Sequence, residues 1–217
     1  MASLRLWDRV YERVRLELGG APGCHDFAHT LRVLKNAERI AAEEPACDLE
    51  AVRFGALLHD VARPEELASG GRLCHAALGA DKARRILEEE GCTDEAFIRH
   101  VSEIVRTHRY RGNLKPATLE ARIVYDADKL DSLGAFGVAR AFHFAGRIGA
   151  CLHNTEQEAL ASESYSSQDS AYRESLVKLR GLPDHLLTEP ARRFAAERAA
   201  FMRAFFDRLN EEQEGIR

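Results

Sequence analysis

The chain has 217 residues, of which 45% are hydrophobic and 30% are charged, and its formal net charge at pH 7 is -4. This length fits one domain with a sizeable core, so we expect a single domain over residues 1–217. The negative net charge argues against general nucleic-acid binding, which favours an excess of Lys and Arg. No apolar run approaches the ~18 residues of a membrane span.

The predicted elements are helices, because apolar residues recur at steps of three and four along most of the chain. Capping residues and Gly or Pro breaks delimit them. The predicted helices cover residues 4–18, 26–44, 48–59, 75–90, 94–108, 119–133, 134–149, 171–180 and 188–212. The polar, Ser-rich stretch 153–170 is predicted to be a long loop. No convincing strand period occurs, so the predicted fold class is all-α.

The five cysteines are odd in number, widely scattered and without a CxxC pair. This usage indicates free thiols in a reducing compartment rather than a disulfide framework or a zinc–thiolate site. The N-terminus is charged and amphipathic, without the apolar segment of a signal peptide. We therefore expect a cytoplasmic protein.

The stretch FGALLHDVARPEE, residues 54–66, carries an apolar helix directly into His59 and Asp60. Burying a charge is costly unless something pairs with it. Two interpretations follow from the residues. Either His59 caps a helix and Asp60 pairs with an arginine, or the two residues bind a metal ion.

Other imidazole and carboxylate groups interrupt apolar stripes in the same way. His29 lies on an apolar stripe of its helix, and YDADKLDSLGAFG offers Asp126, Asp128 and Asp131. Facing helices of a bundle can project such ligands toward one point. Imidazole nitrogens and carboxylate oxygens suit a divalent ion, although no local spacing here resembles HExxH or an EF-hand.

The order His29, then His59 and Asp60, then Asp128 resembles the H…HD…D pattern of the HD-domain metal-dependent phosphohydrolase superfamily. The segments HDFAHTLRVLKNAERIA, LLHDVARPEE and YDADKLDSLGAFGVARAF resemble its motif helices. The C-terminal KLRGLPDHLLTEPARRFAAERAAFMRAFFDRL resembles the closing helices of a small stand-alone bacterial branch that includes nucleotide pyrophosphohydrolases. The resemblance covers about residues 20–210. It implies an HD-domain helical bundle in which these four residues bind one divalent ion, with Mn, Fe, Co, Ni and Mg all open.

The activity that the resemblance implies is hydrolysis of a small phosphorylated metabolite, in first place a nucleotide, by metal-activated water. Pyrophosphate release and monoester hydrolysis both stay open. Lys129 and Arg140 are the predicted phosphate contacts. A homodimer is an open option, and neither nucleic acid nor a membrane is expected as a partner.

Proton transfer has several candidates. Many superfamily members carry an acid three residues after the HD aspartate, but this chain has Arg63 there. Glu65, Glu66 or a different base is then needed. We predict Asp60 and Asp131 as the catalytic carboxylates, since Asp131 lies about one helical turn after Asp128.

His75 and His108 leave a second interpretation open. In two-metal members of the superfamily, two histidines between the HD pair and the last Asp bind a second ion. The preferred prediction for both is substrate contact or support of the metal ligands. The alternative is a dinuclear protein, either a cyclic-nucleotide phosphodiesterase or an HD-fold di-iron oxygenase. A non-enzymatic module braced by its metal is a third option.

Overall fold

The structure is a computed structural model, and it describes residues 2–20, 24–109 and 114–216. Every regular element in these residues is helical, so the prediction of an all-α protein is confirmed. None of the described helices is long and apolar enough to cross a membrane. The chain divides into two compact units, residues 1–128 and 129–217, which we describe one at a time. The expectation of one domain over 1–217 stays a prediction.

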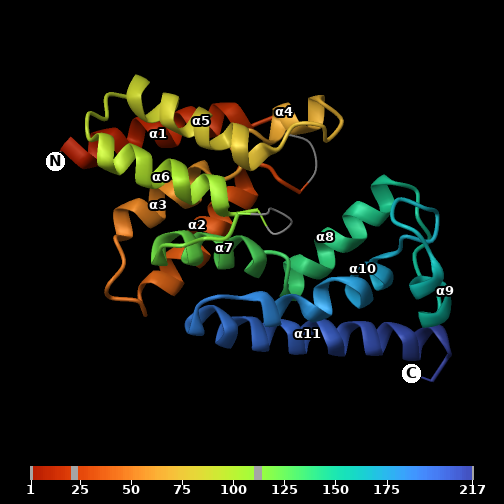
Figure 1. Ribbon diagram of the computed structural model, residues 1–217. Coiled ribbons are helices and arrows are strands. Elements are labelled where there is room, and N and C mark those ends of the chain that lie inside the picture. The colour runs from red at the N-terminus through yellow and green to blue at the C-terminus, as the bar shows by residue number, and fades with distance from the viewer. Residues whose placement is uncertain (1, 21–23, 110–113, 217) are drawn as a thin grey trace. The chain divides into compact units, whose positions relative to one another are not determined.

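The first unit is a bundle built around a buried central helix. Its helices are α1 (Ala2–Leu18), α2 (Phe27–Ala41), α3 (Leu49–Leu58), α4 (Arg63–Ala68), α5 (His75–Glu89), α6 (Glu95–Thr107) and most of α7 (Leu119–Leu130). The central α3 packs against α1, α2 and α6, and α5 runs alongside α6 (Figure 1). Because α3 is covered on several sides, seven of its ten residues are buried.

A glycine sets the close approach of α3 and α6. A Cβ atom on Gly55 would lie 2.5 Å from Cγ2 of Ile104. No real side chain tolerates such a distance, so only glycine fits here without a shift of one helix. This close packing brings the end of α3, where His59 and Asp60 follow, into the interior of the unit.

The second unit contains the C-terminal helices. They are α8 (Gly134–Arg147), α9 (Glu156–Ala161), α10 (Ala171–Val177), a 3₁₀ helix η1 (Leu179–His185) and the long α11 (Glu189–Gln213). Helix α8 packs against α10 and α11, and α9 against α10 (Figure 1). The apolar faces of α8 and α11 meet through aromatic side chains, among them Phe142 and Phe206.

Most predicted helices are present with boundaries shifted by a few residues, but the 3₁₀ helix η1 and two short α-helices of the described residues were not predicted. Helix α4 begins at Arg63, three residues after Asp60, with Pro64 in its first turn. Helix α9 lies inside the predicted loop 153–170 and starts with a capping box of Thr155 and Glu158. Each is six residues long, which is too short for an apolar repeat to be recognised.

Candidate metal centre

The position of His29 follows from how α2 begins. Asp26 is the N-cap of α2, and its side-chain oxygen Oδ1 accepts a hydrogen bond from the backbone N–H of His29 at 2.9 Å. Capping satisfies a backbone donor that the first turn leaves without a helical partner. The cap therefore fixes the first turn of α2, and the His29 side chain that it carries is fully buried.

The position of His59 follows from how α3 ends. His59 is the C-cap residue, fully buried, with Nδ1 2.8 Å from the backbone oxygen of Ala56. A carbonyl oxygen only accepts, so Nδ1 carries a proton, and Nε2 of the neutral ring keeps its lone pair. That Nε2 lies 3.3 Å from Nε2 of His29.

Two carboxylates complete this group. Oδ2 of Asp60 lies 3.5 Å from Nε2 of both His29 and His59. Oδ1 of Asp128, on α7, lies 3.4 Å from Nε2 of His29. The three ligand atoms offered by His29, His59 and Asp128 all lie within 4.8 Å of one another. The structure thus brings together all four residues that the sequence singled out as ligands.

The donor set fits a divalent cation. Imidazole lone pairs and carboxylate oxygens point at one another in the interior, which is unfavourable unless a proton or a positive ion lies between them. Among the described residues no cysteine lies in this group, so the set is the nitrogen and oxygen type that suits Mn, Fe, Co, Ni or Mg. Asp128 is the most exposed of the four, with 19% of its side chain accessible, and leaves an approach from solvent.

The two oxygens of Asp60 face two different groups. Oδ2 faces His29 and His59, and it also lies 2.9 Å from Nδ1 of His25. Oδ1 lies 3.6 Å from Nε2 of His75 and 3.5 Å from Nε2 of His108. Asp60, His75 and His108 therefore form a second cluster of metal-ligand type, all three of them buried.

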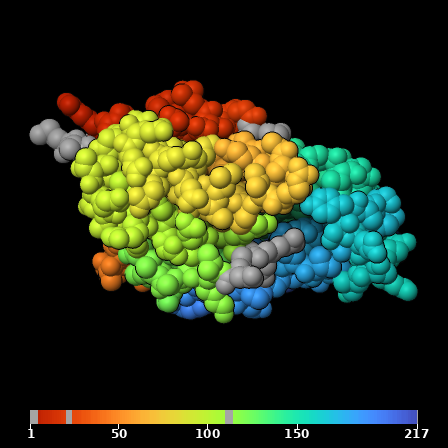
Figure 2. Space-filling model, turned by 45° about the horizontal axis from the view of Figure 1, so that its top comes forward, coloured from red at the N-terminus to blue at the C-terminus, as the bar shows by residue number. Residues whose placement is uncertain are grey.

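The second cluster is supported by its own neighbours. His108 Nδ1 lies 2.6 Å from the backbone oxygen of Val105, which directs its Nε2 toward Nε2 of His75 at 3.1 Å. His75 Nδ1 lies 3.0 Å from Oε2 of Glu66, although without the alignment of a hydrogen bond. Helices α4 and α5, which carry Glu66 and His75, pack together on the surface of the first unit (Figure 2).

The protonation states follow from burial and charge. Burial pushes the pKa of Asp60 upward, but the electrostatic interactions with the neighbouring His59 and with the Arg63 guanidinium outweigh it and hold that pKa well below its usual value. Burial lowers the pKa of His75 to about 4 and also lowers the pKa of His108. At neutral pH the site therefore holds an ionised Asp60 facing neutral His75 and His108, as metal ligands must be.

The predicted pairing of Asp60 with an arginine is also present. Arg63 Nε donates to Oδ1 of Asp60 at 3.0 Å, and Arg63 Nη1 donates to Oε2 of Glu66 at 2.6 Å. His59 does cap its helix. The two interpretations of the HD pair are thus not exclusive, because different atoms of Asp60 take part in each.

In the second unit, the predicted phosphate contact Arg140 pairs with the predicted catalytic residue Asp131. Arg140 Nη1 donates to Oδ2 of Asp131 at 2.7 Å, and both side chains are largely buried. Lys129 is also buried. The roles predicted for Lys129, Asp131 and Arg140 stay predictions.

Two contacts at the centre were missed by sequence reasoning. His25 was given no contact with Asp60, and the bridge from Arg63 through Glu66 to His75 was not foreseen. The signal available for His25 is its place just before the N-cap of the helix that carries His29. Both contacts depend on how α2, α3 and α4 meet, which no local pattern in the sequence reports.

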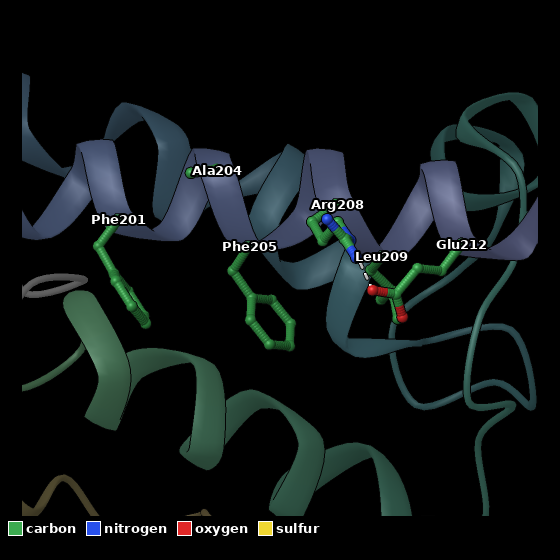
Figure 3. A pocket seen from close by; sticks show the side chains of 6 residues that line it. All are labelled: Phe201, Ala204, Phe205, Arg208, Leu209 and Glu212. Atoms are coloured by element: carbon green, nitrogen blue, oxygen red, sulfur yellow. Dashed lines mark hydrogen bonds and ion pairs between the residues drawn. The ribbon is translucent and has the colours of Figure 1, made fainter. Parts of the chain in front are cut away.

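A depression on α11 has different chemistry. It has a volume of about 390 Å³ and is lined by Phe201, Ala204, Phe205, Arg208, Leu209 and Glu212. The rings of Phe201 and Phe205 point to the same side of the helix, and Arg208 is paired with Glu212 (Figure 3). Its lining residues include neither imidazole nor thiol.

Comparison with known proteins agrees with the geometry of the centre. Residues 26–133 match the family profile described as HD domain. The Bacillus subtilis protein YpgQ is 32% identical over 226 aligned positions, which cover 100% of this chain and 98% of YpgQ.

Solved structures of other proteins are also similar to this chain over most of its length. A crystal structure of YpgQ in complex with ADP has a TM-score of 0.74 and 31% identity, covering 98% of this chain and 97% of the other. The crystal structure of a predicted HD superfamily hydrolase from an uncultured Thermotogales bacterium has a TM-score of 0.67 and 31% identity, covering 94% and 91%.

Proposed function

The chain belongs to the HD-domain superfamily, and from that premise we propose that it is a metal-dependent phosphohydrolase acting on a small phosphorylated metabolite, in first place a nucleotide. The predicted HD-domain bundle is confirmed with the family. The observation that carries the proposed activity is the convergence of His29, His59, Asp60 and Asp128 on one buried point.

The four residues hold the ion in this proposal. When bound, a divalent ion lowers the pKa of a coordinated water from ~15.7 toward neutrality and polarises a phosphoryl oxygen. Two neutral imidazoles and two carboxylates bring about two negative charges, which balance the ion and leave further coordination positions open. A purely structural ion favours a closed ligand set, so the set supports an enzyme rather than a braced module.

The neighbouring residues orient those ligands. Ala56 accepts from His59 Nδ1, which presents Nε2 to the ion. His25 contacts Oδ2 of Asp60 and limits its rotation. Such supporting contacts commonly change metal affinity by ~10–100-fold when removed. Because His29, His59 and Asp60 are buried and held by these contacts, the centre is organised before substrate arrives.

A nucleotide is the preferred substrate for one reason outside the chain. YpgQ, which is similar over its whole length, has been crystallised in complex with ADP. Phosphate recognition in this chain is assigned to Lys129 and Arg140, and proton transfer to Asp131. Lys129 is assigned because it adjoins Asp128, and Asp131 because it lies about one helical turn after Asp128. Arg140 is assigned because its sequence context resembles one that carries an arginine in this branch of the family.

A second candidate function is supported by the cluster of Asp60, His75 and His108. With an ion in each cluster the protein would be dinuclear, as in a cyclic-nucleotide phosphodiesterase or a di-iron oxygenase. A shared carboxylate with one oxygen toward each cluster is the arrangement that such a centre requires.

The proposed function is tested by a product screen. Protein stripped with a chelator is reloaded with Mn²⁺ or Mg²⁺ and offered nucleoside mono-, di- and triphosphates and cyclic nucleotides, with phosphate and pyrophosphate measured separately. We expect metal-dependent hydrolysis that is abolished in His59→Ala and retained in His143→Ala, a change at an exposed histidine of α8. Equal hydrolysis by both variants would refute the proposed centre.

A further inference from the structure

Arg63 lies on the side of Asp60 that faces the second cluster. Its Nε donates to Oδ1 of Asp60 at 3.0 Å. That same oxygen is the one nearest to Nε2 of His75 and of His108, at 3.6 and 3.5 Å. An ion bound by His75 and His108 together with Asp60 has to use this oxygen. Arg63 therefore already occupies the carboxylate position on which a second ion depends.

The guanidinium is fixed in this position. Arg63 begins α4, and its backbone N–H donates to the backbone oxygen of Asp60 at 2.9 Å. Its Nη1 donates to Oε2 of Glu66 at 2.6 Å, and Glu66 is buried. Because two carboxylates and a backbone hydrogen bond already restrict Arg63, holding its guanidinium at Asp60 costs little additional conformational entropy. The guanidinium stays charged at any working pH.

The charges around the second cluster are already balanced. The carboxylates of Asp60 and Glu66 face the guanidinium of Arg63, and Nη2 of Arg109 lies 3.5 Å from Oε1 of Glu66. A divalent ion placed beside His75 adds two positive charges next to these two cations. In a site with reduced dielectric such repulsion is strong at short range.

We propose that Arg63 sets the metal stoichiometry of this protein: its guanidinium supplies at Oδ1 of Asp60 the positive charge that a second divalent ion supplies in a dinuclear centre, and so limits the protein to one ion. The proposal rests on the metal centre proposed above. The first ion is compatible with Arg63, because His29 and His59 face the other oxygen, Oδ2.

Metal counting on charge variants tests this directly. Wild type, Arg63→Gln and Arg63→Lys are loaded with Mn²⁺, freed of excess and analysed for metal per chain, and the affinities are measured by titration calorimetry. Arg84→Gln is the matched control, since Arg84 pairs with Glu88 and Glu95 on the surface of the same unit. We expect one ion in wild type, Arg63→Lys and Arg84→Gln. We expect two in Arg63→Gln, with affinity for the second ion raised on the order of 100-fold.

A histidine variant locates the second ion. In the Arg63→Gln background, His75→Ala should return the count from two to one, whereas in the wild-type background it should leave the count at one. The wild-type arm remains informative if circular dichroism shows that Arg63→Gln does not fold. Two ions in wild type, with one lost in His75→Ala, would overturn the role of Arg63 while leaving a metal-dependent enzyme.

The remaining outcomes separate this proposal from the proposed function. A folded Arg63→Gln protein that still binds one ion would overturn the role of Arg63 and leave the single-ion centre intact. Wild-type protein that binds no ion at millimolar Mn²⁺ would contradict the metal centre itself, and the role of Arg63 with it.

Discussion

Replacing Asp60 with asparagine removes a single charge from the middle of both clusters. The Asp60 side chain is 1% exposed, and its oxygens contact Arg63 and imidazoles on both sides. Asparagine keeps the shape, but its amide offers one acceptor and one donor group instead of two acceptors. The amide NH₂ group of asparagine must then face either the Arg63 guanidinium or an imidazole that contacts a carboxylate oxygen in the wild type.

The expected loss of stability depends on the charge of Arg63, which stays largely buried after its partner Asp60 is replaced. Removing one partner of a buried ion pair typically costs ~3–5 kcal/mol, because the other charge stays buried. Arg63 keeps Glu66 as a second partner, so we expect the lower end, about 3 kcal/mol. In a protein of this size about 1 kcal/mol shifts Tm by ~2–4 °C, which gives a drop of ~6–12 °C for the metal-free protein at pH 7.

Thermal unfolding followed by circular dichroism measures both consequences. With chelator the variant should melt at the lower temperature. With Mn²⁺ at about 100 times its Kd, wild type should gain ~2.7 kcal/mol and the variant almost nothing. Asp81→Asn is the control, because the Asp81 side chain is 71% exposed and pairs with the partly exposed Arg106. An Asp60→Asn protein with unchanged Tm and an intact Mn²⁺ response would refute the reasoning.

Three further changes have defined outcomes. Asp26→Ala removes the cap of α2 and should lower the free energy of unfolding by ~1 kcal/mol in urea titrations, with weaker Mn²⁺ binding because His29 lies in the capped turn. Gly55→Ala should cost ~1–3 kcal/mol in the same titrations, since its Cβ meets Ile104. The metal-free protein should lose stability as pH falls from 6.5 to about 4: the folded state holds the pKa of His75 at about 4, so the unfolded state binds the proton first. A flat profile of unfolding free energy over that pH range would contradict the burial of His75.

Much of the fold was accessible from sequence because its signals are local. The predicted helices 48–59 and 94–108 begin at Asp48 and Asp94, and both aspartates accept backbone hydrogen bonds as N-caps in the first turn of their helices. Apolar periodicity located the long helices. The six-residue helices α4 and α9 were missed because they present less than two turns to the core.

The candidate site divides in the same way. His29, His59, Asp60 and Asp128 were predicted from their order and context, and the structure brings them together. The partition of Asp60, with one oxygen toward each cluster, was not accessible from sequence. It depends on side-chain orientation at the junction of α3 and α4, which only the packed structure defines. The role of Arg63 had appeared only as a departure from the family pattern.

The most direct test of the metal centre is anomalous X-ray diffraction from crystals grown with Mn²⁺. The account predicts one anomalous peak per chain, among the side chains of His29, His59, Asp60 and Asp128. A peak only beside His75 and His108, or none at saturating Mn²⁺, would contradict it.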